Sequence, residues 1–184
     1  MIAVSPVRTR CPGGLVAAIR EATAQHADWP QTAVLVADQL RQHLPGPEML
    51  TAAERRGDPD GYRCHVLHAE PDGSFSVTAM VWRPGQITPV HDHVTWCVFG
   101  VLAGIEYEEL YTVSEDGRYL QEVGRSQNLT GEVSGFAPPG DIHRVRNCGD
   151  GVAISMHVYG ADITRLGSSI RRTYDLPVAA PAAR

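Results

Sequence analysis

Residues 83–104, RPGQITPVHDHVTWCVFGVLAG, carry the pattern on which both the fold and the site depend. His91 and His93 are separated by one residue in a predicted strand, so both imidazoles project from the same face of that strand. Asp92 lies between them and must point the opposite way, which makes it a poor ligand candidate. By itself, an HxH pair in a strand is only a weak sign of a metal site.

Two later segments add histidines to this pair. His143 follows the sharp turn APPGD at residues 137–141, and His157 lies in the next predicted strand, ISMHVYG, at residues 154–160. Imidazoles from neighbouring strands of a small barrel can occupy one face of a metal ion and leave its other face open. The sequence therefore makes His91, His93 and His143 candidate metal ligands.

Strand signals extend from residue 62 to residue 159. Turn signals such as PDG at 71–73, PG at 84–85 and EDG at 115–117 recur at short intervals. Between them apolar and polar residues alternate, as in Phe75, Val77, Ala79 and Val81 against Ser74, Ser76, Thr78 and Met80. Many short strands at this spacing predict a barrel or sandwich of antiparallel sheet.

The chain before residue 60 follows a helical pattern instead. Apolar residues recur at helical spacing in residues 15–22, and Pro30 is well placed to open a second helix, which the PGP sequence at 45–47 ends. We expect two or three amphipathic helices that form no core alone. The predicted organisation is an extension at 1–13, a single domain at 14–175 and a flexible tail at 176–184. The domain comprises a helical part (14–58), a barrel (60–160) and a loop that folds back over the barrel.

Composition excludes several functional classes. All 16 cationic residues of this 184-residue chain are arginines, so Schiff-base enzymes and phosphate-loop NTPases are excluded. The net charge of −5 argues against a nucleic-acid partner, and apolar stretches are far shorter than the ~18 residues that span a membrane. The four cysteines are far apart and form no CxxC pair, which favours a reducing cytoplasm.

The spacing around the histidines resembles the two cupin motifs, G-x5-HxH-x3/4-E-x6-G and G-x5-PxG-x2-H-x3-N. In the first motif Cys97 replaces the usual glutamate ligand, and in the second Gly131 lies one residue out of register. The remaining motif positions match, at Gly85, His91, His93, Gly104, Pro138, Gly140, His143 and Asn147. The resemblance implies an all-β dominated cupin fold, a small antiparallel β-barrel or jelly roll with N-terminal helices.

With cysteine in place of that glutamate, the sequence resembles the cysteine dioxygenase family of cupins, the thiol dioxygenases. Members of this family bind iron through three histidines. Ser155, His157 and Tyr159 resemble the Ser-His-Tyr triad of this family, and residues 83–104 look closest to its bacterial 3-mercaptopropionate dioxygenase branch. The resemblance covers about residues 14–175. It implies an EC 1.13.11 enzyme that binds Fe(II) and adds O2 to the sulfur of a small thiol, giving a sulfinic acid.

This chemistry agrees with the residues. Three neutral imidazoles leave the full charge of a bound Fe(II), which favours capture of a substrate as its thiolate. The Tyr159 phenol would lie near the open face of the metal, His157 could orient it, and Ser155 could fix the tautomer of His157. In animal-type family members the counterparts of Cys97 and Tyr159 are joined by a thioether, so this chain has a candidate Cys97–Tyr159 crosslink. A small buried thiol that packs by the metal is the alternative.

The residues that would select the substrate are less well defined. Tyr62 matches a tyrosine that family members place near the substrate carboxylate, but Cys64 occupies the position of the usual Arg or Gln. Arg171 is the candidate carboxylate anchor, and Arg172 or Arg165 are alternatives. The substrate could be 3-mercaptopropionate, cysteine or a related mercapto-acid.

Two other functions compete with a thiol dioxygenase. One is a non-catalytic or regulatory cupin that binds a metal or a small ligand, which has no need of the Ser-His-Tyr set. The other is a metal-cupin enzyme acting on a non-thiol substrate, and such enzymes usually keep the glutamate that Cys97 replaces. The sequence does not decide the oligomeric state.

Overall fold

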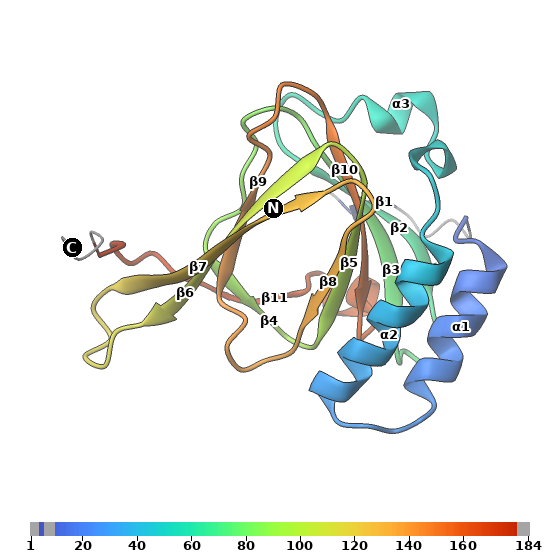
Figure 1. Cartoon of the computed structure of the whole chain (residues 1–184), viewed down its shortest axis with the longest axis horizontal. Coiled ribbons are helices and arrows are strands. Elements are labelled where there is room, and N and C mark those ends of the chain that lie inside the picture. Colours follow the sequence, from blue (N-terminus) through green and yellow to red (C-terminus); the bar gives the residue numbers. More distant parts are fainter. Residues whose placement is uncertain (1–3, 6–9, 180–184) are drawn as a thin grey trace.

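The computed structural model describes residues 4–5 and 10–179, in which β-strands outweigh helices (Figure 1). The strands are β1 (Val4–Ser5), β2 (Arg63–Ala69), β3 (Ser76–Trp82), β4 (His91–His93), β5 (Cys97–Ala103), β6 (Ile105–Val113), β7 (Leu120–Leu129), β8 (Val133–Phe136), β9 (His143–Arg146), β10 (Ala153–Tyr159) and β11 (Ile170–Thr173). They form a six-stranded sheet with the order β1-β2-β3-β10-β5-β8 and a five-stranded sheet with the order β11-β4-β9-β6-β7. All pairings between these strands are antiparallel except that of β1 with β2. The predicted all-β dominated cupin fold is confirmed.

Both faces of the six-stranded sheet are buried along its central strands β3, β10 and β5. In β3 the side chains of Val77, Ala79 and Val81 belong to the main hydrophobic core, whereas Met80 and Trp82 point to the interior of the barrel. Alternate side chains of this strand therefore face two different buried environments, the core under the helices and the interior of the barrel. Neither face contacts water, because the N-terminal helices cover the outer one.

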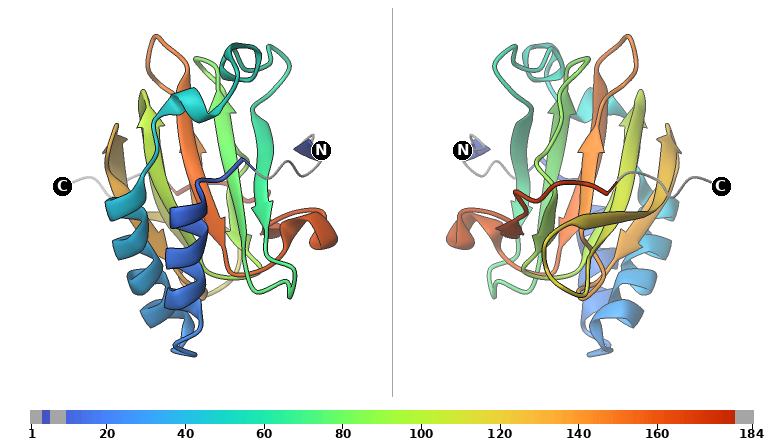
Figure 2. Two further views of the ribbon diagram at one scale, coloured as in Figure 1. Left: turned by 90° about the vertical axis from the view of Figure 1, so that its right-hand side faces the viewer. Right: turned by 90° about the vertical axis from the view of Figure 1, so that its left-hand side faces the viewer.

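The covering layer consists of α1 (Gly13–Thr23) and α2 (Trp29–His43), which lie side by side on the outer face of the sheet (Figure 2). The Asp28 side chain caps α2 by accepting a hydrogen bond from the backbone N–H of Gln31, and Pro30 lies in the first turn, as its fixed backbone angle favours. A short 3-10 turn, Pro47–Met49, and α3 (Ala52–Arg55) lead to β2. The predicted N-terminal helices are thus confirmed.

The end of helix α2 packs closely over Gly100 in β5. A Cβ atom at this position would lie 2.6 Å from Cδ1 of Leu44 and 3.4 Å from Cδ2 of Leu40. Because side chains in protein cores are closely packed, a larger residue at position 100 would push the helix away from the sheet.

The chain after β10 is more structured than a loop. It forms α4 (Ile163–Leu166) and then β11, which pairs with β4. The first part of the predicted flexible tail, residues 176–179, is attached to the start of β7. The Leu120 N–H donates a backbone hydrogen bond to the Pro177 carbonyl, and the Ala179 N–H donates one to the Leu120 carbonyl. Leu176 packs against the small cluster that contains Leu120, which explains this attachment. Residues 180–184 lie outside the described residues.

The predicted extension at 1–13 is also partly integrated into the fold. Val4 and Ser5 pair with β2, Cys11 is buried in the main core, and α1 begins at Gly13. Residues 1–3 and 6–9 lie outside the described residues. Within the described part of the chain, no helix is long and apolar enough to cross a membrane.

The packing of α2 on the sheet can be tested with Leu40, which is completely buried. We expect Leu40→Ala to lower the free energy of unfolding by about 2–5 kcal/mol, because it removes buried apolar atoms and leaves a cavity. The measurement is urea unfolding followed by circular dichroism. Val34→Ala is the matched control on the exposed face of the same helix and should change stability by no more than about 0.5 kcal/mol. Equal losses in the two variants would contradict this packing.

Candidate metal centre

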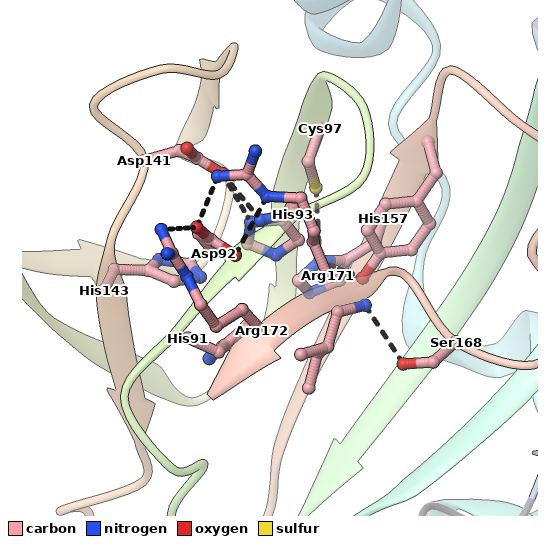
Figure 3. A network of polar contacts seen from close by, with 12 residues as sticks. His91, Asp92, His93, Cys97, Asp141, His143, His157, Ser168, Arg171 and Arg172 are labelled. Atoms are coloured by element: carbon pink, nitrogen blue, oxygen red, sulfur yellow. Dashed lines mark hydrogen bonds and ion pairs between the residues drawn. The ribbon is translucent and has the colours of Figure 1, made fainter. Parts of the chain in front are cut away.

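Three imidazoles converge inside the barrel. His91 and His93 project from the same face of β4, and His143 lies directly opposite His91 on the neighbouring strand β9 (Figure 3). The ring centroids are 4.6 to 4.9 Å apart, and one ligand nitrogen from each ring lies within 4.8 Å of the others. All three side chains are almost completely buried. The structure therefore brings together the three residues that the sequence predicts as metal ligands.

Each imidazole is held in place through its Nδ1 atom. Nδ1 of His91 lies 2.9 Å from the carbonyl oxygen of Pro89. For His93 and His143 the partners are carboxylates, at 3.1 Å (Asp141) and 2.6 Å (Glu108). Since each of these acceptors requires a proton on Nδ1, the lone pair of Nε2 remains available for a metal.

The Nε2 atom of His143 supports this assignment. It is buried and has no hydrogen-bond partner among the described residues, although buried polar atoms in folded proteins are nearly always hydrogen-bonded. A divalent metal ion would satisfy this nitrogen. The three histidines thus fit an ion held by imidazole nitrogens on one side, as in mononuclear metal sites that keep the remaining positions open for ligands.

Electrostatics favour the neutral form of His91 and His93. Burial and the neighbouring imidazoles His143 and His93 lower the pKa of His91 to about 2. Burial also lowers the pKa of His93, although the contact with Asp141 opposes this effect. Neutral imidazole is the form that binds metals, so these two ligands require no deprotonation before metal binding.

The two carboxylates behind the rings are held in the ionised form. Burial raises the pKa of Glu108, but the hydrogen bond and charge interaction with His143, together with Ser126 and Asn128, outweigh it, so the net shift is downward. The pKa of Asp141 is lowered in the same way, because two hydrogen bonds from His93 outweigh the effect of burial. Ionised carboxylates at these positions make the imidazoles better metal ligands.

Strand β10 contributes a second polar group beside the metal centre. Ser155, His157 and Tyr159 alternate along this strand, so they share its inner face. The Ser155 hydroxyl lies 2.9 Å from Nε2 of His157, and the Tyr159 hydroxyl lies 3.4 Å from its Nδ1. Burial lowers the pKa of His157 to about 3, so this imidazole is neutral as well.

Cys97 lies directly opposite Tyr159 in the pairing of β5 with β10. Its sulfur is 3.8 Å from Nδ1 of His157. Burial raises the pKa of the Cys97 thiol and of the Tyr159 phenol well above their usual values, so both groups keep their protons. Among the described residues, the group that could hold a metal ion consists of the three histidines and includes no carboxylate.

A cavity of about 30 Å³ opens beside the three histidines. Cys97, His157, Tyr159 and the polar Tyr62, Thr88 and Ser169 reach it, and its remaining walls are apolar, formed by Met80, Trp82, Phe136, Val145 and Ile170. The Tyr62 ring stacks on Trp82 with a centroid separation of 4.3 Å. A volume of this size admits only a few atoms, which suits a small substrate.

The predicted substrate-binding residues are not all brought to this cavity. Tyr62 lines it, whereas Cys64 is buried in the adjoining hydrophobic cluster. Arg171 points away from the cavity and forms an ion pair of 2.5 Å with Asp92 on the outer side of β4, together with Arg172 (Figure 3). Arg165 pairs with Asp162 near α4.

Three buried acids in or near the site were missed by the sequence analysis: Glu106, Glu108 and Asp141. The segment IEYEELYTV contains a signal for the first two, because their separation of two residues places both on one face of a strand. Asp141 lies in the turn just before His143, where its contact with His93 depends on how β4 and β9 pair.

Comparison with known proteins adds two findings. A family model described as cysteine dioxygenase type I matches residues 51–167, which is more than half of the chain. Among solved structures, the Cupin 2 domain of an XRE-family transcriptional regulator from Enterobacter cloacae has 16% identity and a TM-score of 0.40, covering 53% of this chain and 94% of that one.

Two further solved structures are similar to a comparable degree. A Cupin 2 conserved barrel domain protein from Salinispora arenicola has 22% identity and a TM-score of 0.44, covering 64% of this chain and 92% of that one. A protein with a double-stranded β-helix domain from Klebsiella pneumoniae has 17% identity and a TM-score of 0.47, covering 61% and 84% respectively.

Metal binding tests the ligand assignment. We expect anaerobically added Fe(II) to bind the protein at a ratio of one ion per chain and His143→Ala to abolish this binding, because two imidazoles remain. The measurement is metal content after gel filtration. His43→Ala removes an exposed histidine at the end of α2 and should retain the ion. Glu108→Gln should weaken binding about 10–100-fold through the loss of support for His143. Full iron content in His143→Ala would contradict the assignment.

Proposed function

The chain belongs to the cysteine dioxygenase type I family, and from this premise we propose that it is a mononuclear non-heme Fe(II) thiol dioxygenase. It would add O2 to the sulfur of a small thiol and give a sulfinic acid. The observation that carries the proposal is the group of three buried imidazoles, which among the described residues includes no carboxylate ligand, beside a small cavity that Tyr159 also lines. By family resemblance the candidate substrates are 3-mercaptopropionate, cysteine and related mercapto-acids.

His91, His93 and His143 would hold the ion. When bound there, Fe(II) supplies open coordination positions for a thiol and for O2 and lowers the pKa of the thiol. The overall reaction needs no other reductant: both oxygen atoms of O2 go to the sulfur, which loses four electrons, and the thiol proton ends on the sulfinic acid or in solvent.

The remaining residues act on the reactants through position and hydrogen bonding. Tyr159 keeps its proton and reaches the cavity, so its phenol can donate a hydrogen bond to a bound substrate or to O2. His157 orients that phenol, and Ser155 in turn orients His157. The apolar walls exclude water, which strengthens these interactions and protects the thiol from side reactions.

Substrate contacts follow from the cavity. We propose Tyr62 as a substrate contact, since its side chain lines the cavity and burial raises the pKa of its phenol to about 12, which keeps it a hydrogen-bond donor. Arg171 could bind a substrate carboxylate only by giving up its ion pair with Asp92. Cys64 would act indirectly, by packing behind the cavity wall.

Thiol-dependent oxygen consumption tests the proposed activity. We expect the iron-loaded protein to consume one O2 per thiol converted, with a sulfinate product identified by mass spectrometry. His143→Ala should abolish the reaction, and Tyr159→Phe should slow it about tenfold, the worth of one hydrogen bond. His43→Ala should react like the unaltered protein.

Iron-loaded protein that consumes no O2 across a panel of acidic, neutral and amine-bearing thiols would refute the proposal. Such a result would instead favour a metal-binding cupin without thiol dioxygenase activity.

We also propose a thioether between Cys97 and Tyr159, which lie opposite each other on adjacent strands. Each C–S bond would replace the thiol S–H and one ring C–H, with O2, the co-substrate of the proposed reaction, as the oxidant that takes up the two electrons and two protons. Peptide mapping of turned-over, iron-loaded protein should therefore show the Cys97 and Tyr159 peptides joined, at a mass two hydrogens below their sum. Cys97→Ser should abolish the joined peptide, whereas Cys148→Ser, at an exposed thiol, should retain it. An unmodified Cys97 peptide after turnover would show that this thiol only packs by the metal.

We propose that the protein works in the cytoplasm. All four cysteines are free thiols in the structure, as expected for a protein kept in a reducing compartment.

A further inference from the structure

Glu106 is a buried acid that the proposed reaction does not use. Its side chain lies in β6 with an exposed fraction of 1%, and both carboxyl oxygens are without a hydrogen-bond partner. The buried indole nitrogen of Trp82 is likewise without a partner. Because a carboxyl group loses its hydration on burial, an acid in this position is costly, and it calls for a functional explanation.

The groups around Glu106 come from four strands. The Ser155 hydroxyl on β10 and the Trp82 indole on β3 both face the carboxyl and lower its pKa, although neither completes a hydrogen bond. Glu108 on the same strand raises that pKa by its charge. Asn128 lies opposite Glu106 on β7, and its side-chain amide contacts Glu108.

The hydrogen bonds on β10 continue from Ser155 toward the cavity. The Ser155 hydroxyl bonds Nε2 of His157, whose Nδ1 faces the Tyr159 hydroxyl and the Cys97 sulfur. Glu106 therefore lies at the buried end of a line of polar groups whose other end, Tyr159, lines the cavity.

We propose that Glu106 is a positioning residue that sets the direction of the hydrogen bonds through Ser155 and His157 to Tyr159. The expected effect of Glu106 on turnover rests on the proposed function. The expected arrangement of the hydrogen bonds does not, because it depends only on residues of this chain.

When Glu106 holds a proton, every bond points toward the cavity. The carboxyl O–H turns to the Ser155 oxygen that faces it and donates there, completing a contact that the structure leaves open. The Ser155 O–H donates to Nε2 of His157, and the proton of His157 is on Nδ1. That N–H then donates to the Tyr159 oxygen, which leaves the Tyr159 O–H free to point into the cavity.

When Glu106 is ionised, the bonds reverse. The Ser155 O–H donates to the carboxylate, and the proton of His157 lies on Nε2, from which it donates to the Ser155 oxygen. Nδ1 now accepts the Tyr159 O–H and draws it away from the cavity. The two states differ by one proton, which passes to solvent, while Ser155, His157 and Tyr159 keep the same number of protons in both.

Both states are accessible near neutral pH. Burial raises the pKa of Glu106 to about 7, and the charge of Glu108 adds to this effect. His157 has its own pKa lowered to about 3, so its ring changes tautomer rather than charge over this range. The direction of the bonds should therefore respond to pH in the range where the protein would work.

The tautomer of His157 tests the proposal directly. The full chain is labelled with 15N and loaded with Zn(II), which is diamagnetic, and the His157 ring nitrogens are assigned by comparison with His157→Gln. We expect the proton to move from Nδ1 to Nε2 as pH rises, with a midpoint of about 7. In Glu106→Gln, which retains the shape but does not titrate, one tautomer should persist at every pH. Glu122→Gln, at a distant acid paired with Arg125, should behave like the unaltered protein.

A tautomer change that persists unaltered in Glu106→Gln would overturn the proposal, as would a single tautomer throughout in the unaltered protein. We expect Glu106→Gln to fold, because an amide is less costly to bury than a carboxylate. If it does not, Ser155→Ala provides the second test, since it interrupts the line of hydrogen bonds and should also abolish the pH response of His157.

Turnover provides an independent measurement on the iron-loaded protein. In the unaltered protein and in Glu122→Gln, kcat should depend on an ionisation near neutral pH. In Glu106→Gln this ionisation should be missing from the pH profile of kcat. An unchanged profile in Glu106→Gln would contradict the effect on turnover. If no thiol is converted by any form of the protein, the proposed function fails while the tautomer measurement still decides the role of Glu106.

Discussion

The metal centre depends on the hydrogen bonds made by Nδ1 of three histidines. A strand delivers an imidazole to one side of a barrel, but only a partner at Nδ1 determines which nitrogen carries the proton and how the ring is turned. The partners come from three places: the Pro89 carbonyl just before β4, Glu108 on β6 and Asp141 in the turn before β9. The centre is therefore a product of the pairing of the five-stranded sheet, since β9 lies between β4 and β6.

The N-terminal helices supply hydrophobic stabilisation that offsets the cost of burying polar groups inside the barrel. Helices α1 and α2 give the outer face of the six-stranded sheet an apolar partner, so residues such as Val77, Val98 and Met156 supply the hydrophobic stabilisation. The inner face of the same strands is then free to carry Cys97, Ser155, His157 and Tyr159. One set of strands thus provides both the core and the cavity wall.

The sequence predicts those parts of the site that follow from local periodicity. His91 and His93 share a face because strands have a period of two, and the same rule places Asp92 on the outside, where it binds Arg171 and Arg172. The position of His143 follows from motif spacing. Arg171 could not be placed in advance, because its direction depends on the short helix α4 and on an irregularity in the pairing of β11 with β4.

The acids of β6 show why contacts between strands are harder to predict. Glu106 and Glu108 are identical residues on the same face of one strand, yet their pKa values shift in opposite directions. Burial favours the protonated form of both, but Glu108 receives a hydrogen bond from His143, whereas Glu106 completes none. The register of β6 against β9 therefore determines that one acid supports a metal ligand in its ionised form. The other, lacking such a partner, holds its proton up to neutral pH, and two equivalent residues in the sequence acquire different chemistry.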